Sequence, residues 1–212
     1  MTTLAQMKAE IAADLGRSDL TTYIASAISD AIEEHQSMRF WFNESRNMVL
    51  ETTSGTARYS SLTSGPVSSL DDVVQIDSIW SEDGQNRYRL SERPYEELEL
   101  MDGATTTSRP WEWTRYGSEL WLYPTPDDTY TIRIFGHYKV AKPASDSETG
   151  NVWMTTAYRM ILAYAKSRIY QRRIRNPEFA QADWLDYQAQ LHRLIAEGGK
   201  KLGSGFIEAT RF

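Results

Sequence analysis

Apolar residues recur every three or four positions in residues 4–15, which predicts an amphipathic helix. Thr3 and Gln6 match a capping box at its start, because the hydroxyl and the amide three residues later can each satisfy the other residue's backbone N–H. Gly16 is typical of the residue that ends a helix in the left-handed conformation. The first helix therefore carries a signal at each end.

A second apolar stripe with helical spacing begins at Leu20 and is the clearest helical pattern in the chain. We expect Ser18 or Asp19 to cap this helix, since short polar side chains favour that position. The stripe ends near Phe42 and Asn43, so the helix is expected to run that far.

From residue 48 to residue 140 the chain is rich in Thr, Val, Ile, Tyr and Trp and is punctuated by turn residues, which is typical of antiparallel strands. Asp83-Gly84 and Gly117-Ser118 are expected to form the turns of two hairpins. The stretch RPYEELELMDG has proline where a helix begins and glycine where it ends, which predicts one short helix.

Helical spacing returns after a loop predicted at residues 142–150. One helix is expected to run to Asn176, where Asn176-Pro177 starts the next with Asn as N-cap and Pro as its first residue. Gly198-Gly199 is expected to end this last helix.

These patterns predict a single α+β domain, residues 1–212, in which N-terminal helices and two C-terminal helices pack as a bundle with a central antiparallel β-rich insertion. The expected parts are a helical region at 1–43, a β-rich region at 48–140, a helical region at 151–200 and an extended tail at 203–212.

Composition excludes several kinds of site. The chain has no cysteine, so disulfides, thiolate metal sites and cysteine nucleophiles are impossible. His35, His137 and His192 lie in different predicted elements without the spacing of metal ligands. Carboxylates in adjacent pairs point in different directions, which disfavours a glycosidase, and a hydrolase using residues such as Glu119 is the weakest hypothesis. We expect no enzyme activity, no metal and no cofactor.

Charge is distributed unevenly. Residues 1–158 carry 13 Lys and Arg against 24 Asp and Glu, a net charge of −11, whereas residues 159–203 carry 9 against 4, a net charge of +5. This asymmetry suggests two surfaces that face different partners, although a solvated basic helix explains it equally well. No segment has the pattern of a signal peptide or a run of 18 apolar residues, so we expect synthesis in the cytoplasm and no membrane span.

The segment KSRIYQRRIRNPE concentrates the positive charge. Arg168, Arg172 and Arg175 share one face of the predicted helix, and Arg173 lies beside them. This basic face is expected to meet a neighbouring subunit or another protein partner, because the body of the chain is acidic and Tyr170 is the one aromatic residue in this segment, whereas nucleic-acid binding favours interleaved aromatic residues.

The seven Trp and twelve Tyr residues suggest a second candidate function, the binding of a ligand by aromatic rings. Trp111, Trp113, Trp121 and Tyr123 occupy alternate strand positions, so a hairpin could present them on one face as a sugar-stacking platform. A carbohydrate-binding module is therefore the alternative function, while burial in a core or a protein interface explains the same residues.

Three rings stand side by side in SMRFWFNESR. Phe40, Trp41 and Phe42 would project about 100° apart on a helix, so they cannot all join one core layer. We interpret them as a structural joint between the long helix and the β-rich region, with any exposed ring facing a neighbouring subunit.

The order of three segments resembles the head-to-tail adaptor (connector, neck) proteins of tailed bacteriophages. They are RSDLTTYIASAISDAIEEHQSMRFWFNES, RPYEELELMDGATTTSRPWEWTRYGSELWLYPTPDDTYTIRIFGHYKV and NVWMTTAYRMILAYAKSRIYQRRIRNPEFA. The most telling pieces are RFWFNE, LWLYPTPDD and the Asn-Pro junction between the last two helices.

The resemblance implies a structural virion protein that catalyses nothing. Such adaptors form a ring, usually of twelve copies, beneath the portal in the virion neck, and they extend the DNA channel. The implied partners are the portal protein, a tail or nozzle protein and further copies of the chain, assembled in the host cytoplasm, with DNA only as non-specific channel cargo.

The resemblance also implies a use for the tail GSGFIEATRF. In related adaptors an extended C-terminal segment often reaches the portal, and here Phe206, Ile207, Arg211 and Phe212 would be its portal-binding residues.

Overall fold

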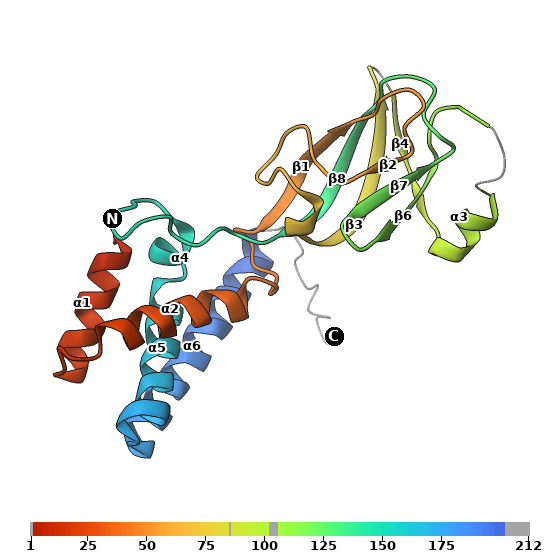
Figure 1. Cartoon of the computed structure of the whole chain (residues 1–212). Helices are drawn as coiled ribbons and strands as arrows, with labels where there is room; N and C mark the ends of the chain where they lie inside the picture. The colour runs from red at the N-terminus through yellow and green to blue at the C-terminus, as the bar shows by residue number, and fades with distance from the viewer. Residues whose placement is uncertain (1, 85, 102–105, 202–212) are drawn as a thin grey trace, which may run out of the picture. The chain divides into compact units, whose positions relative to one another are not determined.

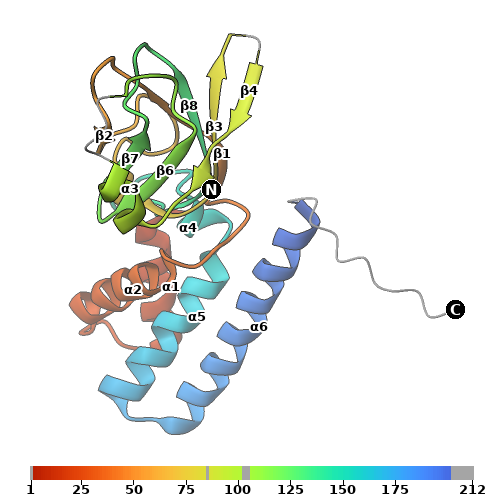
Figure 2. The same ribbon diagram turned by 90° about the vertical axis from the view of Figure 1, so that its right-hand side faces the viewer.

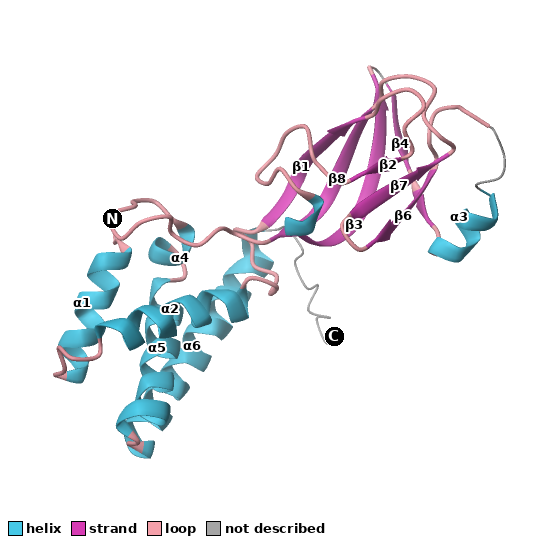
Figure 3. Ribbon diagram, in the orientation of Figure 1, coloured by secondary structure: helices cyan, strands magenta, loops and turns pink. Residues whose placement is uncertain are grey.

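The computed structural model describes residues 2–84, 86–101 and 106–201 (Figure 1). These residues form two compact units: a helical unit, made of the segments before residue 43 and after residue 139, and a β-rich unit between them. Both helices and antiparallel sheets are present (Figure 3), so the predicted α+β class is confirmed. Each unit closes its own hydrophobic core, and the single domain stays a prediction.

The helical unit is built from both ends of the chain. Its elements are α1 (Leu4–Leu15), α2 (Thr21–His35), α4 (Val152–Thr155), α5 (Tyr158–Ile169), the π-helical turn η2 (Tyr170–Ile174) and α6 (Pro177–Lys201). Helix α5 packs against α1, α2 and α6 (Figure 2). Its core joins the apolar stripe of α2 to large side chains of the C-terminal segments, among them Ile24, Ile28, Ile32, Trp153, Met160 and Tyr164.

The predicted signals of the first helix are confirmed. The Thr3 hydroxyl accepts a hydrogen bond from the Gln6 backbone N–H, the Gln6 side chain accepts one from the Thr3 N–H, and Gly16 ends α1 with φ 61°. The predicted cap of the second helix is wrong, because α2 follows Leu20 without a side-chain cap. The Asp19 carboxylate is instead held by the Arg17 guanidinium through two contacts of 2.7 Å.

Helix α2 ends at His35, seven residues before the predicted end near Phe42 and Asn43. The Phe40 and Phe42 rings are stacked, with centroids 5.0 Å apart, and both meet Trp153 edge-on. Residues two positions apart point about 200° apart on a helix, so this stacking requires non-helical backbone. The apolar spacing continues beyond the helix because the rings still enter the core.

The junction of the last two helices follows the prediction in part. Asn176 caps α6, because its side-chain oxygen accepts a hydrogen bond from the Phe179 N–H at 3.2 Å. Pro177 is the first residue of α6. Helix α5 ends earlier than predicted, because a π-helical turn follows Ile169 and Arg175 then takes a left-handed conformation with φ 57°.

The predicted end of the last helix at Gly198-Gly199 is wrong, since α6 continues to Lys201. Gly198 is buried, and a Cβ atom there would lie 3.9 Å from Trp41. The Lys201 ammonium lies 3.5 Å from the centroid of the same ring. These contacts hold the last turn in helical form despite the low helix propensity of glycine.

The β-rich unit contains two four-stranded sheets, with strand orders β1-β8-β3-β4 and β2-β7-β6-β5. Among the described pairs only β5 and β6 run parallel. The strands are β1 (Glu44–Glu51), β2 (Arg58–Tyr59), β3 (Val73–Asp83), β4 (Asn86–Arg89), β5 (Ser91–Glu92), β6 (Glu112–Tyr116), β7 (Glu119–Tyr123) and β8 (Thr131–Tyr138). A turn η1 (Leu70–Asp72) precedes β3, and α3 (Tyr95–Met101) is the predicted short helix, which begins just after Pro94.

Both predicted hairpins are present, with β3 pairing β4 and β6 pairing β7. The two sheets share a core of aliphatic side chains from facing strands, among them Met48, Leu50, Ile79, Leu120, Leu122, Ile132 and Ile134. Gly136 lies where the register of β3 and β8 shifts, and a Cβ there would stand 2.0 Å from the Gln75 carbonyl oxygen. The two ends of the unit adjoin, since the Tyr138 N–H donates to the Asn43 carbonyl at 2.9 Å.

Candidate functional site

The predicted basic face lies at the end of the helical unit where α5 passes into η2. Arg168 is held within the unit: its Nε and Nη2 donate to the Tyr164 hydroxyl at 3.0 and 2.6 Å, and Nη2 lies 3.6 Å from the Glu34 carboxylate. The hydrogen bond to Tyr164 raises the pKa of Arg168. Arg168 therefore fixes α5 to α2 and exposes only part of its charge.

Arg172, Arg173 and Arg175 are exposed. The Arg173 guanidinium lies 3.7 Å from the centroid of the Tyr23 ring, which places it over α2. The helical spacing that would align Arg175 with Arg168 does not apply, because the π-helical turn and the left-handed residue intervene. The structure brings the four arginines to one end of the unit, and we call the three exposed ones the arginine end.

A pocket of about 210 Å³ lies between α2 and α5 beside the arginine end. Its charged lining residues are Asp30, Glu34, Arg168, Arg172 and Arg173. Fixed charges of both signs around a small depression suit contact with a protein surface, because each sign can meet its opposite on a partner.

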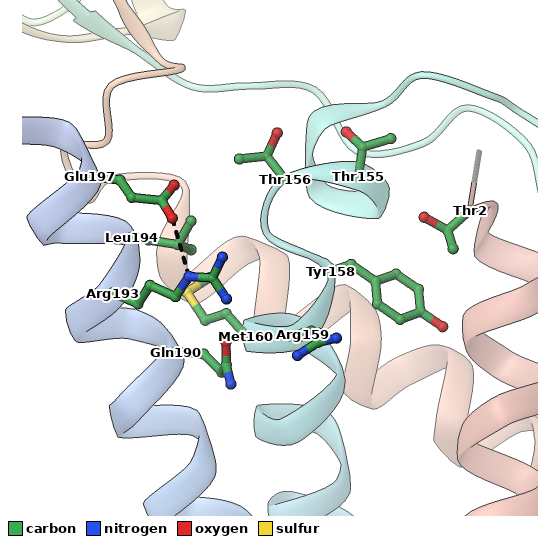
Figure 4. A pocket seen from close by; sticks show the side chains of 10 residues that line it. All are labelled: Thr2, Thr155, Thr156, Tyr158, Arg159, Met160, Gln190, Arg193, Leu194 and Glu197. Carbon is green, nitrogen blue, oxygen red and sulfur yellow. Dashed lines mark hydrogen bonds and ion pairs between the residues drawn. The ribbon is translucent and has the colours of Figure 1, made fainter. Parts of the chain in front are cut away.

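A second pocket, of about 410 Å³, lies between the start of the chain, the α4–α5 connection and α6 (Figure 4). Thr155 and Thr156 supply hydroxyl groups, and Arg159 and Arg193 supply guanidinium groups. The Arg193 Nε donates to Glu197 at 3.1 Å, so the carboxylate of this pocket is already engaged. The residues that line this pocket include no histidine.

The three rings of the predicted joint belong to the helical unit. Phe40 is 2% exposed, and Trp41 and Phe42 are partly buried. Trp41 meets the edge of Phe42, with centroids 5.8 Å apart, and lies against Gly198 of α6. The rings fasten the segment after α2 to α4 and α6, and their role as a joint to the β-rich region stays a prediction.

The predicted sugar-stacking platform does not form. Trp113 and Trp121 are 4% and 3% exposed, and Trp111 is 50% exposed. Trp113 pairs with Leu122 and Trp121 pairs with Thr114, so the two tryptophans point to opposite faces of the sheet. Alternation within each strand was predicted correctly, but the register between the strands separates the rings.

A buried polar cluster was missed by the sequence analysis. His35 is 1% exposed, its Nδ1 lies 2.6 Å from the Ala31 carbonyl, and its Nε2 lies 2.8 Å from the Tyr187 hydroxyl. Burial lowers the pKa of His35, so the neutral ring is favoured. The signal in the sequence was a histidine placed on the apolar stripe of α2.

An ion cluster joins three helices of the same unit. Lys166 of α5 lies 2.9 Å from the Asp14 carboxylate of α1 and 3.3 Å from the Asp183 carboxylate of α6. Burial raises the pKa of Asp183, while its contact with Lys166 opposes that rise. The cluster is a structural clamp.

Two further findings concern metal binding and membrane spans in the part of the chain that the structure describes. No group of three or more His, Asp or Glu side chains there is placed to hold a metal ion. None of the helices in that part of the chain has the length and hydropathy needed to cross a membrane. The portal-binding residues predicted in the tail, Phe206, Ile207, Arg211 and Phe212, lie outside the described residues.

The chain belongs to a family of phage head-to-tail adaptors, since the model of the family described as SU10 adaptor protein matches residues 2–204. No curated protein matches the chain in sequence. Membership of this family makes the chain a phage adaptor and a virion component that assembles with portal and tail proteins.

Proposed function

We propose that the protein forms a ring in the virion neck between the portal and the tail or nozzle, and that the ring extends the channel through which DNA passes. The proposal rests on the family match over residues 2–204. In this proposal the ring holds about twelve copies, as a closed cyclic assembly of identical subunits. It assembles in the host cytoplasm, catalyses nothing, and meets DNA only as non-specific cargo.

Two surfaces support contacts with protein partners in this proposal. The arginine end offers Arg172, Arg173 and Arg175 to carboxylates of a neighbouring subunit or another neck protein. The tail, through Phe206, Ile207, Arg211 and Phe212, binds the portal in the manner that the family resemblance implies. Because long-range attraction is screened by salt, the contact of the arginine end is expected to weaken as salt is added.

The direct test is to mix the purified full-length protein with its portal and image the product by electron microscopy. We expect a second ring stacked on the portal ring. Failure to associate under any assembly condition would contradict the proposed function.

The two surfaces can be tested separately in the same assay. Deletion of residues 203–212 is expected to leave a folded protein that docks poorly on the portal; unchanged docking would move the contact to the helices. The double variant Arg172→Glu/Arg173→Glu is expected to weaken assembly most at low salt. Arg87→Glu/Arg89→Glu changes the net charge equally on the β-rich unit and is the matched control. If both double variants assemble alike, the arginine end is only a solvated surface.

A further inference from the structure

Helix α3 carries a large apolar side chain on its outer side. Leu98 is fully buried, and the Tyr95 ring packs on the rings of Tyr116 and Trp121, so these residues mark the inner side of the helix. Leu100 follows Leu98 by two positions, which is about 200° around the helix, and it is 88% exposed. It is the most exposed of the large apolar side chains that the structure describes. Contact with a partner would remove this apolar surface from water.

Carboxylates surround Leu100. Helix α3 contains three Glu residues and no Lys or Arg. Glu97 is engaged by the Arg93 guanidinium at 3.2 Å. Glu96 and Glu99 are exposed, and their carboxylates make no hydrogen bond or ion pair with any residue that the structure describes. We call Glu96, Glu99 and Leu100 the α3 outer face, which joins an exposed aliphatic side chain to two unpaired negative charges.

The pocket between α2 and α5, beside the arginine end, has an apolar floor. Ala27 of α2 and Tyr164 and Ile169 of α5 line it, and all three are buried. Its volume of about 210 Å³ is below the roughly 300–1,000 Å³ of pockets that hold a whole small-molecule ligand. A pocket of this size with an apolar floor suits one aliphatic side chain of a protein partner.

One end of this pocket is bordered by positive charge. The Arg172 guanidinium is exposed and makes no hydrogen bond or ion pair within the described part of the chain. Arg173 is also exposed, and its guanidinium lies over the Tyr23 ring without a carboxylate partner among the described residues. Both cations can therefore meet the carboxylates of a partner.

The acidic residues of the same pocket lie further along α2. Glu34 accepts a hydrogen bond from the Tyr164 hydroxyl and lies 3.6 Å from Arg168, so its charge is already balanced. Asp30 is exposed, and it follows Tyr23 by seven residues, which is about 10 Å along the helix. The lining holds three arginines against two carboxylates. A partner's carboxylates are therefore favoured beside the arginine end and disfavoured beside Asp30.

We propose that the α3 outer face of one copy docks at the arginine end of the next copy, with Leu100 in the pocket and Glu96 and Glu99 beside Arg172 and Arg173. The inference rests on the proposed function, because it names a contact by which identical subunits form the ring. The contact joins two different surfaces, so each copy keeps one of each surface free for a further neighbour and the contact repeats around a ring.

Cysteine cross-linking tests the contact directly, because the chain contains no cysteine of its own. Ser26 is exposed and lines the pocket. The single variants Ser26→Cys and Leu100→Cys are mixed, assembled on the portal, oxidised and analysed without reductant. We expect covalent dimers from the mixture and mainly monomers from either variant alone. Gln188→Cys, at an exposed position of α6, replaces Ser26→Cys in the matched control, which should stay monomeric.

The outcomes separate this inference from the proposed function. A ring on the portal without covalent dimers overturns the contact and leaves the adaptor function standing. A disulfide that forms only within one copy of the double variant Ser26→Cys/Leu100→Cys, identified by mass spectrometry, also overturns the contact between copies. Absence of both the ring and the dimers overturns both proposals.

Charge reversal gives a second readout that does not depend on disulfide geometry. We expect Glu96→Lys/Glu99→Lys to raise the protein concentration needed for ring assembly roughly tenfold. Combination with Arg172→Glu/Arg173→Glu should restore most of this loss, because the two signs are exchanged across the contact. Combination with Arg87→Glu/Arg89→Glu is the matched control and should restore none of it. If the α3 reversal assembles like the wild type while the arginine reversal fails, the arginine end binds another neck protein and the proposed contact is wrong.

Truncation of the apolar side chain tests the pocket. Leu100→Ala is expected to raise the concentration needed for ring assembly roughly tenfold, since a side chain that fills a pocket contributes most to such a contact. Leu185→Ala on α6, where the leucine is 56% exposed, is the matched control. Circular dichroism checks that both variants are folded. Equal assembly by the two variants would contradict insertion of Leu100 into the pocket.

Discussion

The helical unit and the β-rich unit use their large side chains in different ways. In the helical unit the rings of Tyr164 and Tyr187 are buried, and aliphatic side chains of α6 are left on the surface. In the β-rich unit Trp113 and Trp121 are buried, and two exposed rings pack on other rings: Tyr116 on Tyr95 and Trp111 on Tyr123, with centroids 4.8 and 6.2 Å apart. The two units therefore differ in what they expose, aliphatic side chains of a helix in one and pairs of rings in the other.

The largest expected effect comes from opening the helical core. Trp153→Ala removes a fully buried ring that contacts Phe40 and Phe42, and we expect a loss of about 3–5 kcal/mol in the free energy of unfolding. Because the β-rich unit has a separate core, amides of β3 and β8 should keep their protection from hydrogen exchange. Equal loss of protection in both units would show that they unfold together.

The corresponding change in the β-rich unit is Gly136→Ala. The new Cβ would stand 2.0 Å from the Gln75 carbonyl oxygen, so β3 and β8 must move apart. We expect a loss of about 1–3 kcal/mol in denaturant unfolding, as for an overpacked core. Gly199→Ala is the control, because nothing lies within 4 Å of its added Cβ and alanine favours a helix. Similar losses in the two variants would disprove the close approach.

Removing the ion clamp should affect the helical unit less than opening its core. Lys166→Met leaves the Asp183 carboxylate, 17% exposed, without its cation. We expect a loss of about 1–3 kcal/mol in thermal or denaturant unfolding. Lys142→Met, which removes an ion pair with the 59% exposed Glu33 side chain, is the control and should change stability much less, because water screens an exposed pair. If Lys166→Met is as stable as Lys142→Met, the ion cluster does not stabilise the helical unit.

The smallest effect is a dependence of the stability of the helical unit on pH. Burial lowers the pKa of His35 below its ordinary 6.5, so the unfolded chain binds a proton there more readily than the folded one. Stability is therefore full above pH 6.5 and falls as the pH drops below it, by less than about 1.4 kcal/mol per unit. The groups facing the ring are Glu34, Tyr164 and Tyr187.

Unfolding of the wild type and of His35→Gln between pH 7 and pH 5 measures this contribution. The variant should lose the part of the dependence that begins near pH 6.5. Parallel curves for the two proteins would contradict a contribution from His35.

Local signals in the sequence were reliable where a few neighbouring residues determine the structure. Thr3, Gln6 and Gly16 set both ends of α1, and Asn176-Pro177 sets the start of α6. In each case the side chain bonds to backbone within four residues, so no distant contact is needed.

The failures occurred where distant contacts decide the outcome. Gly198 would end an isolated helix, but Trp41, far away in the sequence, packs against it and α6 continues. The partner of Trp121 in the sheet depends on a register that alternation alone does not reveal. The order of eight strands in two sheets depends on such pairings throughout.

The hydrogen bond between Tyr138 and Asn43 holds the first and last residues of the β-rich unit close together. A unit whose first and last residues adjoin can be removed and replaced by a short turn without stretching the segments on either side. We therefore expect a chain without the β-rich unit still to form the helical bundle. A different domain whose termini lie close together could be inserted at the same position.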